Sequence, residues 1–160
     1  MVDATTGHEA LSFMDGSSRY DQIRMTLSDE EMTAFRIPTG IYCYEVMPFG
    51  LKSAGATYRR AMQKVFDDML YKYVESYVDD LVVKSKRRQD LLKDLKVMFN
   101  RLQKYQLKMN PLKCAFSVTS GKFLSFIVRR RRIEIDPSNI DVIQKMPRPK
   151  SLYDLRSLQG

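Results

Sequence analysis

The chain has 160 residues, and its apolar fraction of 44% is enough for the core of one domain. Its 27 lysines and arginines outnumber 19 acids and give a formal net charge of +8, which favours a polyanionic partner, nucleic acid first. A basic surface that serves only solubility explains the same charge equally well.

The same composition argues against secretion, membrane insertion and a zinc site. The chain has no run of about 18 apolar residues, and residues 1–6 lack the basic and apolar regions of a signal peptide. Cys43 and Cys114 lie far apart in the sequence and fit a reducing compartment, the cytoplasm or the nucleus. With one histidine and two cysteines, a bound metal is expected to be magnesium or manganese held by carboxylates.

Short strands and turns are predicted before the first helix. The apolar run Leu11–Met14 ends at Asp15 and a Gly-Ser-Ser turn, which predicts a buried strand with an acid at its end. Pro38 and Gly40 predict a tight turn, and the strands on either side of it are expected to form a hairpin. The other elements predicted here are a weak strand over Gln22–Leu27, a polar turn over 28–31, and the hairpin strands over Thr33–Ile37 and Ile41–Val46.

Two amphipathic helices flank a second hairpin. Apolar residues recur every three or four positions over Ala54–Leu70 and Gln89–Tyr105, so both segments are predicted to be helices with a packing face. Between them, Tyr77-Val78-Asp79-Asp80 has strand-forming residues on both sides and predicts a hairpin with two acids at its tip. Paired aspartates are also common in turns without any catalytic role. Asp67 and Asp68 are expected to be such a pair, on an exposed helix surface.

Short strands return in the last third of the chain, followed by two helices. Asp136 and Pro137 predict the cap and the first residue of a short helix. Ser151 and Asp154 resemble a capping box for a final helix, after a stiff linker that contains Pro147 and Pro149. The remaining elements are strands over Lys113–Val118, Lys122–Val128 and Ile133–Ile135 and a turn over 119–121.

The order of these elements predicts an α+β fold of the split β-α-β, ferredoxin-like type, with two helices packed on one face of an antiparallel sheet. In this plan Asp15 and Asp79 lie on neighbouring central strands, at the same end. With Asp80 they supply three carboxylates, which suits a site for two metal ions. One ion lowers the pKa of an attacking hydroxyl, and the other holds a triphosphate and its leaving group. Such phosphoryl transfer depends on positioning and charge neutralisation and needs no nucleophilic side chain.

The ordered motifs resemble those of the palm of a reverse transcriptase from a gypsy-class long-terminal-repeat retrotransposon polyprotein. The segments that carry the resemblance are Phe13–Ile23, Thr33–Phe35, Val46–Lys52, Ala54–Tyr58, Tyr77–Asp80, Asn110–Phe116 and Gly121–Leu124. The resemblance implies an incomplete polymerase fold that lacks most of the fingers and thumb. Residues 1–146 would form the palm with a partial fingers hairpin, and residues 147–160 a linker and the start of the connection toward the thumb.

The resemblance also implies an activity, RNA-directed DNA polymerase, and its catalytic residues. A primed RNA or DNA template and deoxynucleoside triphosphates would be the partners. Asp15, Asp79 and Asp80 would be catalytic and would hold two Mg²⁺ ions, with Mn²⁺ as the alternative metal. Tyr20 would lie under the incoming sugar and exclude a 2′-hydroxyl, unless it is an ordinary core aromatic.

Further contacts with the nucleotide and the primer follow from the same resemblance. Phe49 and Gly50 would line the nucleotide pocket. Phe123 and Leu124 would belong to a hairpin that grips the primer end, and a place in the hydrophobic core explains them equally well. Lys113 would assist pyrophosphate departure or contact template phosphate, unless it is a solvated surface lysine.

Five positions depart from the family pattern. They are Arg19, Ser125 and Arg132 in place of glycine, Ser53 in place of asparagine, and Arg59 in place of glutamine. A turn with positive φ at Arg132 would cost roughly 1 kcal/mol. The run Arg129–Arg132 is either an RNA-contacting or nuclear-targeting patch or a solvated β-turn.

The fingers segment that precedes the first catalytic motif in the family, with its basic residues that clamp the triphosphate, is not in this sequence. We therefore expect the isolated chain to have weak or no polymerase activity. The alternatives are a non-catalytic, basic nucleic-acid-binding remnant of a retrotransposon and a decaying copy without a function.

Overall fold

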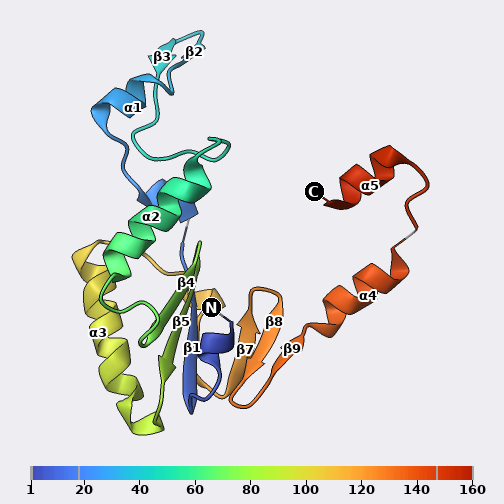
Figure 1. Cartoon of the computed structure of the whole chain (residues 1–160). Coiled ribbons are helices and arrows are strands. Elements are labelled where there is room, and N and C mark those ends of the chain that lie inside the picture. Colours follow the sequence, from blue (N-terminus) through green and yellow to red (C-terminus); the bar gives the residue numbers. More distant parts are fainter. Residues whose placement is uncertain (1, 18, 147, 160) are drawn as a thin grey trace.

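The computed structural model describes residues 2–17, 19–146 and 148–159. Its centre is a four-stranded antiparallel sheet in the order β4-β5-β1-β6 (Figure 1). We call this sheet the palm sheet, after the fold that the resemblance implies, and its strands are β1 (Ala10–Asp15), β4 (Val74–Tyr77), β5 (Asp80–Ser85) and β6 (Ala115–Val118). The predicted antiparallel α+β fold is confirmed.

The central strand β1 is buried along most of its length, because both faces of the palm sheet are covered. Apart from Ser12, its buried residues are therefore apolar on both faces instead of alternating with polar residues. In the pairing with β5, Ala10 lies opposite Ser85 at one end and Asp15 lies opposite Asp80 at the other. This register sets the positions of the acids that the sequence singles out.

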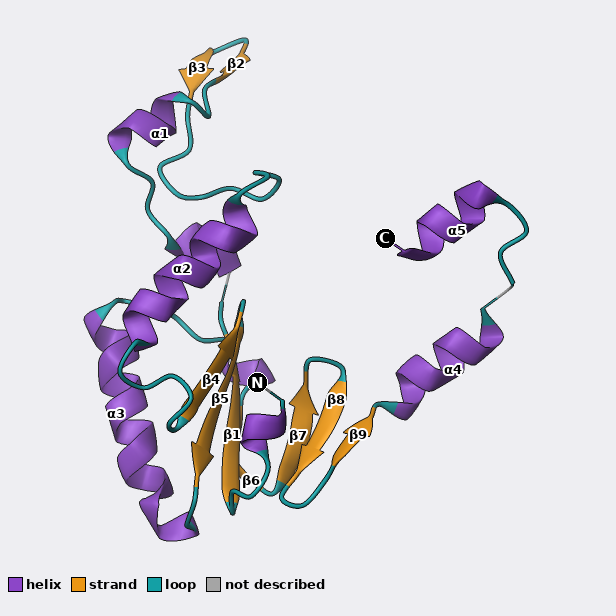
Figure 2. Ribbon diagram, viewed as in Figure 1, coloured by secondary structure: helices purple, strands orange, loops and turns teal. Residues whose placement is uncertain are grey.

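Two helices, α2 (Ala54–Phe66) and α3 (Leu91–Lys104), cover one face of the palm sheet (Figure 2). Their predicted apolar stripes face the sheet and form the main core with Met14, Leu81 and Val83. The buried helix residues are Ala54, Tyr58, Met62, Val65 and Phe66 of α2, and Leu91, Leu95, Met98 and Leu102 of α3. The prediction that α2 continues to Leu70 is wrong, because the chain turns after Phe66 and the Met69 N–H donates to its carbonyl at 2.8 Å.

A three-stranded antiparallel sheet in the order β7-β8-β9 covers the opposite face. Its strands are β7 (Ser120–Phe123), β8 (Phe126–Arg129) and β9 (Ile133–Ile135). A second core lies between the two sheets and contains Leu11, Phe13, Val82, Phe123 and Val128. Alternate residues of β1 thus face the helices and the second sheet, as the pleat of a strand requires.

The predicted single strand over Lys122–Val128 and the predicted turn over 119–121 are wrong. The chain reverses at Leu124 and Ser125, which have φ of 51° and 67°. Residues 120 and 121 instead belong to β7. The apolar run conceals this reversal, because neither turn residue is a glycine.

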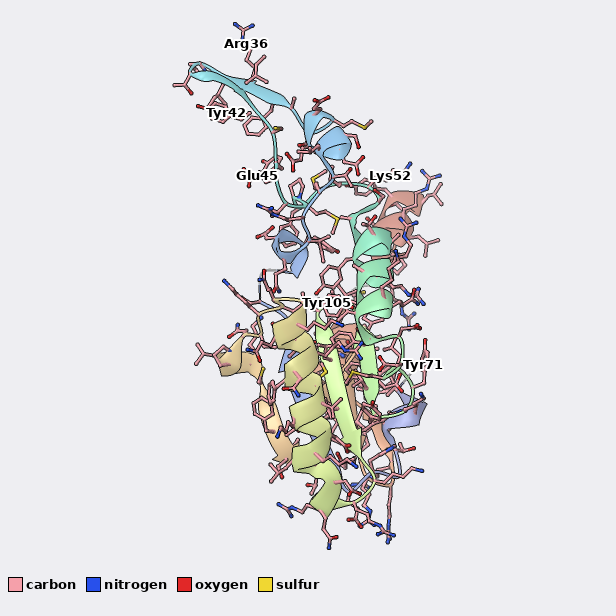
Figure 3. All side chains as sticks on the ribbon, turned by 90° about the vertical axis from the view of Figure 1, so that its left-hand side faces the viewer. Arg36, Tyr42, Glu45, Lys52, Tyr71 and Tyr105 are labelled. Atoms are coloured by element: carbon pink, nitrogen blue, oxygen red, sulfur yellow. The ribbon has the colours of Figure 1, made fainter. Side chains whose placement is uncertain are left out.

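The hairpin predicted on either side of the turn at Pro38–Gly40 is confirmed, and its strands are β2 (Phe35–Ile37) and β3 (Gly40–Tyr42). It extends away from the palm sheet, and Arg36 lies at its far end (Figure 3). Stacking within the hairpin holds it together, because the Phe35 ring lies 6.2 Å from the Tyr42 ring and 5.3 Å from the Tyr44 ring.

The strand predicted over Gln22–Leu27 and the turn predicted over 28–31 are wrong. A single bridge joins Arg24 to Val46, and a short helix, α1 (Leu27–Glu31), follows. Asp29 and Glu30 lie in the first turn of α1, where negative charge favours a helix.

The predicted caps of the two C-terminal helices, α4 (Pro137–Lys145) and α5 (Leu152–Gln159), are confirmed. The Asp136 carboxylate accepts from the Ser138 N–H at 3.0 Å. Ser151 and Asp154 form a reciprocal capping box, in which each side chain accepts from the other's N–H at 3.1 Å. Pro147 lies outside the described residues. Short 3-10 turns occur at Asp3–Thr5 (η1), Arg19–Gln22 (η2), Arg88–Asp90 (η3) and Pro111–Lys113 (η4).

A buried ion pair joins the strands of the hairpin that carries the two adjacent acids. Lys84 Nζ on β5 lies 2.6 Å from Glu75 Oε1 on β4 and donates to the Ala4 carbonyl at 2.9 Å. The side chains expose only 3% and 1% of their area, respectively.

Within the described residues, no helix is long and apolar enough to span a membrane.

Candidate catalytic site

The three candidate acids gather at one end of the β1–β5 pair. Asp15 ends β1, Asp80 begins β5, and the two lie directly opposite each other. Residues in that relation point to the same face of a sheet. Asp79 precedes Asp80 in the hairpin turn, and its carbonyl accepts from the Gly16 N–H at 2.8 Å. The register therefore brings Asp15 and Asp80 together at the same end of neighbouring strands, whereas Asp79, which was predicted to lie on the strand, lies in the turn.

The hairpin turn beside these acids carries a strained residue. Tyr77 pairs with Asp80, which leaves Val78 and Asp79 as a two-residue loop. Val78 has φ of 50°, a left-handed conformation that is rare for a β-branched side chain. Such strain costs about 1–3 kcal/mol and occurs most often at functional sites. Turns with this conformation usually carry glycine, which adopts it without strain. Because valine stands here instead, the loop sequence alone does not indicate the conformation.

The donor set at this end of the sheet is chemically suited to a hard cation, because it consists of carboxylate oxygens. The side chains do not yet form a closed cage: among the described residues, no group of three or more His, Cys, Asp or Glu side chains is arranged to hold a metal ion. The Asp15 carboxylate lies 3.6 Å from Lys113 Nζ. Lys113 thus lies beside Asp15, and its side chain is 63% exposed, which fits the solvated surface position that the sequence left open.

The residues expected to contact the nucleotide form an aromatic cluster. The Tyr20 ring lies 5.1 Å from the Phe49 ring and 5.5 Å, edge on, from the Tyr58 ring. Phe49 is 60% exposed and so offers a ring face to solvent. Gly50 follows with φ of 96°, a conformation that suits glycine. The structure thus places Tyr20, Phe49 and Gly50 together, and their roles remain predictions.

Tyr58 is a member of this cluster that sequence reasoning assigned only to the packing stripe of α2. It is buried and links the aromatic cluster to the acids. Its hydroxyl lies 3.5 Å from the position of a Cβ added to Gly16, the residue after Asp15. The available signal was its place in the segment Ala54–Tyr58, directly after the segment that contains Phe49.

Phe123 and Leu124 occupy different environments, although both were expected to contact a primer. Phe123 is 2% exposed and packs in the second core, which fits the core alternative that the sequence left open. Leu124 lies in the β7–β8 turn, partly buried against the same core. The primer contact of this hairpin remains a prediction, with Leu124 the more accessible residue.

The departures from the family pattern have separate outcomes. Ser125 takes a positive φ where the resemblance has glycine, whereas Arg132 does not and pairs with Glu134 at 2.6 Å. The strain expected at Arg132 is therefore found at Ser125. Arg59 lines an open depression beside the hairpin, together with Val78. The Ser53 side chain does not cap α2, and the Arg19 side chain lies outside the described part of the chain.

The second pair of adjacent acids is exposed as expected, but it lies in the turn after α2 and not on the helix surface predicted for it. Asp67 and Asp68 follow α2, and both are exposed. The Asp68 carboxylate lies 2.7 Å from the Arg101 guanidinium on α3. The ion pair between Asp68 and Arg101 connects the end of α2 to α3, so Asp68 has a structural role.

A split β-α-β sheet with acids at the ends of two central strands is the arrangement of a nucleic-acid polymerase palm. The sequence matches the family described as reverse transcriptase (RNA-dependent DNA polymerase) over residues 1–128, and the chain belongs to this family.

The curated relatives are retrotransposon polyproteins that are much longer than this chain. It is 29% identical over 154 residues to the Transposon Tf2-3 polyprotein of Schizosaccharomyces pombe, a match that covers 96% of the chain and 12% of the relative. It is 33% identical over 147 residues to the Retrovirus-related Pol polyprotein from transposon opus of Drosophila melanogaster, covering 92% of the chain and 15% of the relative. The Retrovirus-related Pol polyprotein from transposon gypsy of the same species is 30% identical, and the match covers 92% of this chain and 14% of the relative.

Solved structures of foamy viral protease-reverse transcriptases share the fold. One, in complex with RNA/DNA hybrid, has a TM-score of 0.80 and 20% identity, and the match covers 99% of this chain and 22% of that one. Another, in complex with double-stranded DNA, has a TM-score of 0.81 and 21% identity, and the match covers 94% of this chain and 26% of that one. This chain therefore spans roughly a quarter of the length of those chains.

Proposed function

We propose that the chain is the palm of an RNA-directed DNA polymerase and acts within a retrotransposon polyprotein. Its substrates are a primed RNA or DNA template and deoxynucleoside triphosphates. The observation that supports this proposal best is the register that sets Asp15 opposite Asp80, with Asp79 in the adjoining turn. Residues 1–146 form the palm with a partial fingers hairpin, and residues 147–160 begin the connection toward the thumb.

The three acids, Asp15, Asp79 and Asp80, are the proposed holders of two Mg²⁺ ions, with Mn²⁺ as the alternative. When bound, these ions would lower the pKa of the primer hydroxyl and neutralise the triphosphate. The strands contribute by setting Asp15 and Asp80 opposite each other. Lys113, which lies 3.6 Å from Asp15, reduces the mutual repulsion of the acids.

The aromatic cluster is the proposed nucleotide pocket. Contacts with Phe49 and Tyr58 on two sides hold the Tyr20 ring in place, so it acts as a fixed steric barrier to a 2′-hydroxyl. The exposed face of Phe49 is available to the nucleotide, and Gly50 allows close approach of backbone. Leu124, in the β7–β8 turn, is the proposed primer contact, with Phe123 supporting the hairpin from the core.

The isolated chain is proposed to have weak activity or none. It spans 12–15% of the length of the polyproteins that it matches. Much of the surface that holds template and triphosphate in a full polymerase therefore belongs to other segments.

Primer extension and metal binding test this proposal together. Purified chain at high concentration receives an RNA template, a DNA primer, dNTPs and Mg²⁺, and Mn²⁺ binding is followed by electron paramagnetic resonance. We expect weak extension and Mn²⁺ binding, both lost in Asp79→Asn. Asp67→Asn removes an exposed acid away from the site and is expected to retain both. Retention of both signals in Asp79→Asn would contradict the assignment of the site.

A second candidate function is a basic nucleic-acid-binding remnant without turnover, which the net charge of +8 favours. In that case a primed template binds equally well in EDTA, and its affinity falls steeply with salt. Absence of both extension and Mn²⁺ binding, together with such salt-dependent binding, supports this candidate over the polymerase.

A further inference from the structure

Two basic runs that are far apart in sequence meet at one end of the palm sheet. Lys86, Arg87 and Arg88 directly follow β5, and Arg129–Arg132 span the end of β8 and the turn into β9. All seven side chains are exposed. The segment that precedes β1 connects the two runs: the Glu9 carboxylate accepts from the Arg88 N–H at 3.2 Å and from the Arg130 guanidinium at 3.1 Å. We call these seven residues the distal basic surface.

The distal basic surface lies at the opposite end of the sheet from the candidate catalytic acids. Ser85 pairs with Ala10 at the near end of the β1–β5 ladder, and Asp80 pairs with Asp15 at the far end. Five strand steps separate these pairs, which corresponds to about 17 Å. In the view of Figure 1, the end of β5 and the β8–β9 turn both lie at the lower edge of the sheets. The distal basic surface is therefore separate from the catalytic acids.

The carboxylates on this surface leave an excess of positive charge. Glu134 lies between Arg129 and Arg132, at 3.3 Å and 2.6 Å, and Glu9 pairs with Arg130. Two carboxylates thus serve three arginines and fix the orientation of their guanidinium groups. Arg87 and Arg131, both exposed, have no carboxylate within ion-pair distance among the described residues. The surface is therefore partly pre-oriented and retains unneutralised cations.

The shape beside the arginine run suits a phosphate group. The four arginines line an open depression together with Thr119 and Ser120. Guanidinium groups bind phosphate through two parallel hydrogen bonds, and hydroxyl groups provide additional donors. An extended row of cations with nearby hydroxyls is typical of contacts to the phosphodiester backbone, which carry no sequence information.

We propose that the distal basic surface binds the phosphodiester backbone of nucleic acid, independently of sequence and away from the catalytic acids. The regular charge of a nucleic acid matches two basic runs that lie on one edge, and each phosphate can accept from the guanidinium groups and from the nearby hydroxyl groups together. The binding requires neither metal nor turnover, so it holds whether or not the chain is an active polymerase.

Matched charge removal tests the proposal. Arg87→Gln/Arg131→Gln removes one cation from each run and disrupts no ion pair described above. Lys64→Gln/Lys96→Gln removes the same charge from exposed positions on α2 and α3, away from this surface. Fluorescence anisotropy in EDTA measures the binding of a labelled RNA/DNA hybrid over a series of salt concentrations. Polyglutamate serves as a competing polyanion without phosphate.

For the Arg87/Arg131 variant we expect an affinity loss on the order of tenfold at 0.1 M salt and a salt-dependence slope that is shallower by about 2. The control variant is expected to bind nearly as the original chain does. Equal losses in the two variants would mean that only net charge matters, and efficient competition by polyglutamate would mean that phosphate is not recognised; either result overturns the proposal. The Asp79→Asn chain is expected to bind the RNA/DNA hybrid as the original chain does, which separates binding at the distal basic surface from catalysis.

Discussion

Lys84 and Glu75 form an ion pair inside the palm, and replacing Lys84 with methionine is expected to destabilise the fold strongly. The substitution removes the cation and nearly keeps the length of the side chain. With 1% of its side chain exposed, Glu75 would be left as a buried carboxylate without its partner, and the Ala4 carbonyl would lose its donor. Breaking a buried pair in this way costs about 3–5 kcal/mol.

A loss of that size is a large part of the roughly 5–15 kcal/mol that stabilises a domain. Urea unfolding followed by circular dichroism measures it. Arg24→Met provides the control, because Arg24 pairs with Glu45 at 3.8 Å with both side chains largely exposed. Exposed pairs contribute about 0–1 kcal/mol, so the control should unfold at nearly the original urea concentration.

The double variant Lys84→Met/Glu75→Leu separates the effect of charge from that of packing. Glu75 Oε2 is buried without a hydrogen-bond partner among the described residues, so the original pair already carries an unsatisfied atom. Removing both charges is therefore expected to recover most of the stability that the single substitution loses. A loss below about 1 kcal/mol for Lys84→Met, or a double variant no more stable than the single one, would refute this reasoning.

Three further changes test two backbone positions and one helix cap. Val78→Gly is expected to be about 1 kcal/mol more stable to urea than Val78→Ala, because only glycine takes φ of 50° without strain; equal stabilities would contradict this. Gly121→Ala is expected to destabilise by about 2–3 kcal/mol, because its Cβ would lie 2.2 Å from the Phe13 ring; an unchanged unfolding midpoint would contradict the close approach. A hydrogen bond from Lys122 is the main cause that lowers the pKa of Asp136 to about 2, so the cap of α4 is fully formed above about pH 4 and weakens as the pH falls toward 2. Lys122→Met should raise that pKa toward 3.8 in an NMR titration, and an unmoved pKa would rule out the contact as its cause.

Local sequence signals predicted the elements that depend on local physics. The apolar periodicity of α2 and α3 and the caps at Asp136 and Ser151 are all present in the structure. The reversal at Leu124 and Ser125 could not be predicted, because tertiary packing imposes a left-handed conformation on residues that do not favour it.

The sequence predicted which acids lie at the candidate site but not which other side chains contact them. The motif around Asp79 and the apolar strand before Asp15 were sufficient to expect acids at neighbouring strand ends. The contact between Lys113 and Asp15 and the bridging position of Tyr58 depend on distances between separate elements. No local pattern encodes such distances, so only the folded chain reveals them.

The position of β1 at the centre of the palm sheet has a consequence for how the chain folds. Ala10 pairs with Ser85, and Leu11 pairs with Val118, so the strand synthesised first waits for partners that emerge much later. Contacts between such remote segments slow folding, because a large loop must close before they form. Until then the apolar face of β1 is exposed on the nascent polypeptide and is available to chaperones and to aggregation. Protection of the central strand during synthesis is therefore expected to favour folding over aggregation.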